Sequence, residues 1–203
     1  MTLTLLCLLF FQEPAKNDGW ISLFNGKNYA GLNFYIGPGP EHTFDVKDGC
    51  MYIKAPLAGY TYTRQKYRNY ELKFDWKFER PETLTDDKTF TGNSGVLLHI
   101  NKILKSWPQS VEVEGRYLEV GKMMAYGKAT VDFKDYPDAR LAAKKPVGQW
   151  NSTHITSKDG ALTVTLNGKL VSEGTTDLRE GFIGFQAQGA NILYRDIKLR
   201  EIK

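Results

Sequence analysis

The chain has 203 residues, a formal net charge of +4 at pH 7 and 25% charged residues. Its basic side chains are spread among acidic ones, which excludes the clustered positive surface of a nucleic-acid-binding protein. With 19 glycines, 11 tyrosines, 11 phenylalanines and four tryptophans, the composition favours a turn-rich sheet protein, and the length suffices for one β-sandwich domain.

The chain begins with an apolar segment, residues 1–11. The run is too short to cross a bilayer as a helix, so no stable membrane span is expected. It is typical of the apolar region of a secretory signal peptide, although the positively charged start is missing, and a buried strand is the alternative. We expect a leader over residues 1–15, a folded domain over residues 19–203, and secretion or export to a periplasm. Because Cys7 falls in the leader, Cys50 is expected to be an unpaired core residue.

The first half of the folded part reads as short strands separated by turns. Strands are expected at residues 21–24 and 60–63, and residues 44–53 predict a hairpin that turns at Asp48-Gly49. Glycine and proline between positions 31 and 40 predict a loop. The clearest strand covers residues 70–79, where apolar and charged side chains alternate without exception.

The second half continues the pattern after a polar loop at 81–91. Residues 117–146 show no clear pattern: residues 123–127 could be a strand end or a loop that lines a site, and residues 135–146 look irregular. Further strands are expected at 152–157, 161–166, 169–171, 181–188 and 192–202, with type I′ turns at Asp159-Gly160 and Asn167-Gly168. Since no segment has a sustained helical period, the sequence predicts an all-β sandwich of antiparallel strands.

Residues 92–115 carry the most suggestive polar groups. They predict two alternating strands, and alternation places Glu112 and Glu114 on the face opposite Val111 and Val113. On the preceding strand, the same rule places Val96, Leu98 and Ile100 on one face. It places Leu97 and His99 on the other. Two carboxylates, an imidazole and an Asn-Ser-Gly turn are therefore expected near one sheet surface.

Several short pieces occur in a characteristic order along the chain. They are Leu23-Phe24-Asn25-Gly26-Lys27, Asn93-Ser94-Gly95-Val96, the pair Glu112 and Glu114, Trp150-Asn151, Leu166-Asn167-Gly168, Gly184-Phe185-Gln186 and Tyr194-Arg195-Asp196-Ile197. This ordered set resembles the 3-keto-disaccharide hydrolase family over nearly all of residues 19–203. The resemblance implies a concanavalin-A-like jelly-roll sandwich with a concave sugar-binding face, in secreted or cell-envelope bacterial proteins that act on oxidised glycosides. The chain departs from the usual family residues at His99, Glu114 and Gln188.

Cleavage of a glycoside already oxidised at C3 is the activity that the resemblance implies. The ketone acidifies the C2 proton, so a base can remove it, the C1 oxygen can leave by β-elimination, and water can then add. We assign Glu112 as the leading acid or base, Glu114 as its partner, and His99 as a second base candidate. Carboxylates two residues apart on one strand lie about 7 Å apart, close enough for one to raise the pKa of the other.

The remaining site candidates are groups that could hold a sugar. Hydrogen bonds to sugar hydroxyls are expected from Asn93, Gln186 and Gln188. Aromatic rings bind the apolar faces of sugars, and the stacking candidates are Trp107, Tyr117 and Tyr126.

Other readings of the same residues remain open. A divalent cation such as Ca²⁺ could bind to His99, Glu112 and Glu114, although the spacing matches no recognisable metal motif. The two glutamates could instead form a solvated face, and His99 could be a hydrogen-bonded structural residue. The protein could also be a non-catalytic carbohydrate-binding jelly roll, or a conventional glycosidase whose two carboxyl groups flank the bond.

Overall fold

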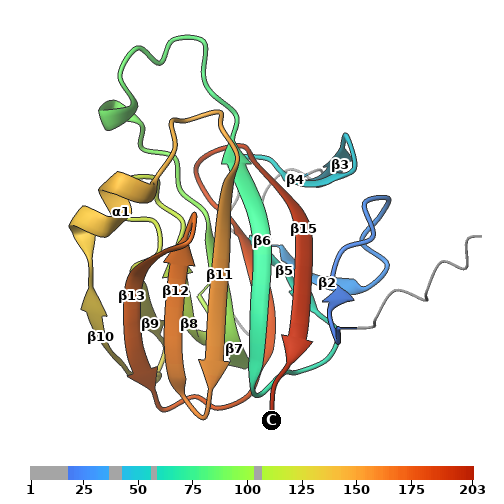
Figure 1. The fold of residues 1–203 in the computed structure, drawn as a ribbon. Coiled ribbons are helices and arrows are strands. Elements are labelled where there is room, and N and C mark those ends of the chain that lie inside the picture. Colours follow the sequence, from blue (N-terminus) through green and yellow to red (C-terminus); the bar gives the residue numbers. More distant parts are fainter. Residues whose placement is uncertain (1–17, 37–42, 56–58, 103–106) are drawn as a thin grey trace, which may run out of the picture.

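The computed structural model describes residues 18–36, 43–55, 59–102 and 107–203 (Figure 1). The leader expected over residues 1–15 lies outside the described residues. The described chain forms two antiparallel β-sheets packed face to face, which confirms the jelly-roll sandwich. No helix in these ranges is long and apolar enough to cross a membrane.

The large sheet faces the viewer in Figure 1 and is built around β6, β11 and β15. Its strands, in spatial order, are β10 (Val131–Asp135), β13 (Lys169–Thr176), β12 (Ala161–Leu166), β11 (Asn151–Lys158), β6 (Tyr70–Phe78), β15 (Ile192–Glu201), β4 (Cys50–Ile53) and β3 (Phe44–Lys47), and β1 (Ile21–Ser22) also pairs with β15.

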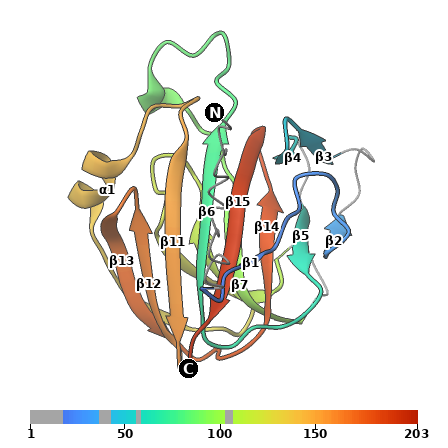
Figure 2. The same ribbon diagram turned by 45° about the vertical axis from the view of Figure 1, so that its right-hand side comes forward.

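The small sheet lies behind the large one (Figures 1 and 2). Its strands, in spatial order, are β2 (Leu32–Ile36), β5 (Gly59–Thr63), β14 (Phe182–Ala187), β7 (Gly95–Lys102), β8 (Gln109–Glu114) and β9 (Met123–Tyr126). Strands β7 and β8, which carry the candidate carboxylates, are therefore neighbours, and β14 brings a distant part of the sequence alongside them.

Strand β6 behaves as its alternation predicts. Its apolar residues all belong to the core between the sheets: Tyr70, Leu72, Phe74, Trp76 and Phe78. The charged residues between them face solvent on the outer side of the large sheet, where Arg195 and Arg200 of β15 pair with Asp75 and Glu71. The regular alternation thus gives β6 one face in the core and one toward solvent, and its pairing with β11 and β15 places it inside the large sheet.

The predicted tight turns are also confirmed. Asp48-Gly49 joins β3 to β4, Asp159-Gly160 joins β11 to β12, and Asn167-Gly168 joins β12 to β13. All six residues have positive φ, from 47° at Asp159 and Asn167 to 84° at Gly160. Type I′ turns need this conformation at both central positions, so aspartate or asparagine followed by glycine is the expected pair.

Two predictions for irregular segments were wrong. Residues 32–36, expected to lie in a loop, form β2 and pair with β5. Within residues 135–146, expected to be irregular, a short helix α1 (Pro137–Ala143) forms, and it follows β10 at the edge of the large sheet. Pro137 occupies the first turn of that helix, where a missing N–H costs nothing. A 3₁₀ turn, η1 (Asp87–Thr89), completes the regular elements of the described residues.

Candidate active site

The outer face of the small sheet carries most of the predicted site residues. Val96 and Val113 point into the core, so Leu97 and Glu112 point outward by alternation. The two outward residues lie directly opposite each other in the β7–β8 register, and Gly184 of β14 lies opposite Leu97 on the other side. The site is thus centred where β14, β7 and β8 run side by side.

Glu112 lies directly over the backbone of β7 at Gly95. A Cβ atom at position 95 would lie 2.0 Å from Oε1 of Glu112 and 2.9 Å from its carboxyl carbon. The glycine of the Asn-Ser-Gly sequence therefore provides the space that the carboxyl occupies. Glycine inside a strand commonly marks such a close approach.

The environment of Glu112 favours the protonated acid. The residue is only 1% exposed, and among the described residues neither carboxyl oxygen has a hydrogen-bond partner. Burial, and secondly the charge of Glu114, raise the pKa of Glu112 to about 8. The Tyr126 hydroxyl interacts with the ionised form and opposes this shift, although it forms no hydrogen bond of ordinary geometry to either oxygen. A carboxyl with this pKa can both accept and donate a proton near neutral pH.

Glu114 is hydrogen-bonded to the loop that follows β8. Its Oε1 accepts a hydrogen bond from the backbone N–H of Arg116 at 2.8 Å, and the residue is 3% exposed. Burial raises the pKa of Glu114, while that backbone hydrogen bond opposes the shift. The two glutamates are therefore not equivalent. Glu112 has free carboxyl oxygens, whereas Glu114 holds the loop and raises the pKa of its neighbour.

The expectation that His99 joins the carboxylates was wrong. The register of β7 against β8 shifts between Leu98 and Lys102, and His99 has a φ of +54°. This bulge inserts an extra residue, which reverses the alternation. The ring of His99 consequently points into the core, where Nε2 lies 2.8 Å from Oγ of Ser157 on the large sheet.

Ile100 takes the outward place instead. It lies opposite Phe182 and packs with Tyr60 and Leu97 on the outer face. Burial, and then the charge of Arg179, lower the pKa of His99 to about 4, so its ring is neutral at pH 7. His99 is a structural residue between the sheets.

Gln186 and the Asn93–Gln188 pair extend the site along β14 and β7. Asn93 forms an isolated antiparallel bridge with Gln188, and its Nδ2 donates to Oε1 of Gln188 at 3.1 Å. The same register carries Gln186 to a position opposite Gly95, beside the space that Glu112 fills. Gln186 is 2% exposed, lies opposite Tyr60 on β5, and its Oε1 has no partner.

Trp107 and Tyr126 lie together at the other side of the carboxyl. Their rings stack with centroids 4.9 Å apart and planes 27° apart, and Trp107 is 39% exposed. Tyr126 is on β9, on the same face as Glu112. The third stacking candidate, Tyr117, was predicted wrongly: it is buried in the core, and its hydroxyl lies within hydrogen-bond distance of two acceptors, Asp87 Oδ2 at 3.2 Å and the Lys145 carbonyl at 3.1 Å.

Unsatisfied hydrogen-bond acceptors gather on this face. In the part of the chain that the structure describes, the buried oxygens of this face without a partner are Oε1 and Oε2 of Glu112, Oε1 of Gln186, Oδ1 of Asn93 and the Tyr60 hydroxyl. Folded proteins satisfy most buried polar groups, so such a cluster needs an explanation. A ligand rich in hydroxyl groups would supply the missing donors.

The residues that could have held calcium are not brought together. His99 points into the core while Glu112 points outward, so the set of His99, Glu112 and Glu114 does not assemble. Within the described ranges no group of three histidine, cysteine, aspartate or glutamate side chains is arranged to bind a metal ion.

Two residues of this face were missed by the sequence reasoning. Gly95 was noted only as part of a turn, although a glycine in an otherwise β-rich run is a signal of close approach. Tyr60 was assigned to a strand without a role, yet it is the register partner of Gln186. Only the pairing of β5 with β14 reveals this second relationship, because the two residues are far apart in sequence.

Comparison with known sequences gives a clear family result. Residues 19–200 match the family described as the 3-keto-alpha-glucoside-1,2-lyase-like domain. The chain belongs to this family. A 3-keto-disaccharide hydrolase from Bacteroides thetaiotaomicron is 22% identical over 247 aligned positions, which cover 93% of this chain and 80% of the relative.

Solved structures share the fold at low identity. A candidate glycosyl hydrolase from Parabacteroides distasonis superposes with a TM-score of 0.64 at 22% identity, over 91% of this chain and 94% of the other. The carbohydrate-binding module CBM66 from Bacillus subtilis superposes with a TM-score of 0.51 at 11% identity, over 90% of this chain and 96% of the module. These likenesses show the jelly-roll sandwich.

Proposed function

We propose that this protein cleaves 3-keto-glycosides, including 3-keto-disaccharides, with Glu112 as the group that moves the proton. Family membership and the Bacteroides relative support the substrate class. The observation that carries the proposal is the state of Glu112: buried, free of hydrogen bonds at both oxygens, and with a pKa raised to about 8. A structural carboxylate would normally have its oxygens satisfied.

Glu112 first acts as the base. A ketone at C3 makes the C2 proton acidic, and a carboxylate of raised pKa is a stronger acceptor than an ordinary one. Removal of that proton forms the enolate, which expels the oxygen on C1 and leaves a C1–C2 double bond. The site therefore needs a ketone in the substrate and does not need a carboxylate nucleophile.

The same carboxyl can then serve as the acid. C2 and C1 are adjacent, so a proton taken from C2 can be returned to the departing oxygen. Both oxygens of Glu112 are without partners, while Glu114 is held by the loop amide of Arg116. Water adds across the double bond in the last step, with hydroxide to C1 and a proton to C2, and yields the free 3-keto sugar.

Neighbouring groups would hold the oxidised ring. The Gln186 amide and the Tyr60 hydroxyl can donate hydrogen bonds to the ketone oxygen as negative charge develops on it. Trp107 and Tyr126 offer a ring surface for an apolar sugar face. Because Glu112 is 1% exposed, neighbouring side chains must shift to admit the substrate.

The direct assay compares an oxidised glycoside with its parent. Purified protein is incubated with a disaccharide oxidised at C3 and with the unoxidised disaccharide, and the released sugar is measured. Turnover of the keto compound alone supports the proposal. Turnover of the parent would instead indicate a conventional glycosidase, and binding without turnover of either would indicate a carbohydrate-binding module.

A further inference from the structure

A large hollow lies next to the proposed active site, at the end of the small sheet where β7 begins. Its volume is about 710 Å³. Three segments line it: the loop after β6, the residues just before β7, and the turn between β14 and β15. The lining residues include Glu79, Arg80, Thr91, Gly92, Gly189 and Asn191.

The hollow adjoins the Asn93–Gln188 pair. Gly92 directly precedes Asn93, and Gly189 directly follows Gln188, so each strand passes from the site into the wall of the hollow. Asn93 forms bridges with both Gln188 and Gly189. Asn93 precedes β7 and is two residues from Gly95, a spacing of about 7 Å in extended backbone. The Asn93–Gln188 pair therefore lies between Gly95, over which the Glu112 carboxyl packs, and the first lining residues of the hollow.

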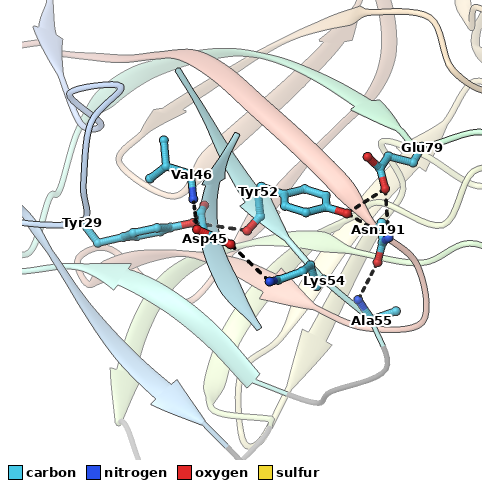
Figure 3. A network of polar contacts seen from close by, with 8 residues as sticks. All are labelled: Tyr29, Asp45, Val46, Tyr52, Lys54, Ala55, Glu79 and Asn191. Atoms are coloured by element: carbon cyan, nitrogen blue, oxygen red, sulfur yellow. Dashed lines mark hydrogen bonds and ion pairs between the residues drawn. The ribbon is translucent and has the colours of Figure 1, made fainter. Parts of the chain in front are cut away.

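Hydrogen bonds hold the wall of the hollow in place (Figure 3). Asn191 Nδ2 donates to the Tyr52 hydroxyl at 3.0 Å and to Glu79 Oε2 at 2.9 Å, while Asn191 Oδ1 accepts from the backbone of Ala55 at 2.9 Å. Burial opposes ionisation of Glu79, but hydrogen bonds from Lys47, Tyr52 and Asn191 outweigh it and lower the pKa of Glu79 to about 2. The turn that carries Gln188 is thus fixed before any ligand binds.

The lining matches a neutral, hydroxylated ligand. Glu79 is paired with Lys47 and Arg80 with Asp87, so neither charge calls for a counter-ion. Threonine hydroxyls at positions 83, 89 and 91 and the carboxylate of Glu82 supply further polar surface, and the apolar part of the lining comes from Pro81, Leu84, Phe90 and Ala190. An anionic ligand would require an unpaired cation here, and a lipid would require a mainly apolar lining.

We infer that this hollow binds the leaving group of the substrate and that it selects a second sugar there. The inference rests on the proposed function and adds a subsite to it. Asn93 and Gln188 lie between the two binding regions and would contact the sugars near the bond that breaks. The oxidised sugar occupies the face at Glu112, and its partner sugar occupies the hollow.

A variant that fills the hollow provides the test. Thr91→Trp places a large ring among the lining residues, and Thr175→Trp, on the exposed surface of β13, is the matched control. Kinetics and calorimetry are measured with two ligands: a 3-keto-disaccharide, and the methyl glycoside of the same oxidised sugar. We expect Thr91→Trp to raise KM and Kd for the disaccharide about tenfold or more, to leave the methyl glycoside unchanged, and Thr175→Trp to alter neither.

The outcomes separate the subsite from the reaction. Equal effects of Thr91→Trp on both ligands, or no effect on either, would overturn the subsite while leaving the hydrolase proposal intact. If the wild type turns over neither ligand, the hydrolase proposal fails. Calorimetry then still decides on the subsite, through the tighter binding of the disaccharide and its loss in Thr91→Trp.

Discussion

The carboxyl of Glu112 occupies the space that a side chain at Gly95 would need. An added Cβ would lie 2.0 Å from Oε1 of Glu112, far inside van der Waals contact. We predict that Gly95→Ala displaces the carboxyl and lowers kcat/KM for a 3-keto-glycoside by about 100-fold, as expected when a catalytic group is moved by about an ångström. Because only a side chain on the outer face of the sheet is displaced and the strand pairing is kept, circular dichroism should show an unchanged fold.

A double variant tests whether this loss is steric. Glu112→Asp shortens the side chain by one methylene and leaves room for an alanine at position 95. The double variant Gly95→Ala/Glu112→Asp should therefore be at least as active as Gly95→Ala alone. As a control, Gly184→Ala adds a Cβ on the same face, where it meets Ile100 Cδ1 at 2.9 Å rather than the carboxyl, and should have the smaller effect. Additive losses in the double variant would contradict a positioning role for Gly95.

Ionisation of Glu112 should set the pH dependence of the reaction. As the base, Glu112 must be deprotonated, and its pKa is raised to about 8. We predict that kcat/KM rises with pH through a midpoint near pH 8, a measurement made on the free enzyme with substrate below KM. If kcat/KM instead falls with rising pH through the same midpoint, Glu112 enters the reaction as the acid.

Protonation of Glu112 should also couple to stability. Its folded pKa of about 8 exceeds the ordinary value of 4.5, so the folded state holds a proton that the unfolded state has released between these values. The free energy of unfolding contributed by this group therefore falls as pH rises from 4.5 through 8, at about 1.4 kcal/mol per pH unit at most. Glu112→Gln should remove this dependence. The Tm of the variant minus the Tm of the wild type should therefore be larger at pH 9 than at pH 5. Equal Tm differences at both pH values would argue against the raised pKa.

His99 should matter for folding and not for catalysis. His99→Asn keeps a residue that tolerates positive φ but loses the contact with Ser157. We predict a loss of about 1 to 3 kcal/mol in the free energy of unfolding, in urea denaturation, because buried hydrogen-bonding groups lose their partner. Per folded molecule, kcat and its pH profile should remain those of the wild type. A selective fall in kcat would return His99 to the mechanism.

Local patterns predicted much of this fold. The alternation of β6 and the Asp-Gly and Asn-Gly turns could be read correctly, because each depends only on residues close together in sequence. Strand β2 was missed since its five residues lie between glycine- and proline-rich segments, and only its pairing with β5 identifies it.

The candidate site was predictable in part for the same reason. Alternation alone placed Glu112 on the outer face, but His99 depended on a bulge that the local pattern does not contain. A Cβ at Gly181 of the neighbouring chain segment would lie within 2.3 to 2.6 Å of the His99 backbone. The close approach that accompanies the bulge thus involves a residue more than 80 positions away.

Solvent deuterium provides the most direct test of the central claim, that Glu112 removes the C2 proton. The reaction of a 3-keto-disaccharide is run in D₂O, and the released 3-keto sugar is examined by mass spectrometry and NMR at early times, with the free sugar incubated alone as the exchange control. Elimination followed by addition of water predicts one deuterium at C2 in wild-type product, and loss of both turnover and C2 exchange in Glu112→Gln. Product that retains its original C2 proton, or a Glu112→Gln variant that exchanges C2 at the wild-type rate, would contradict the proposal.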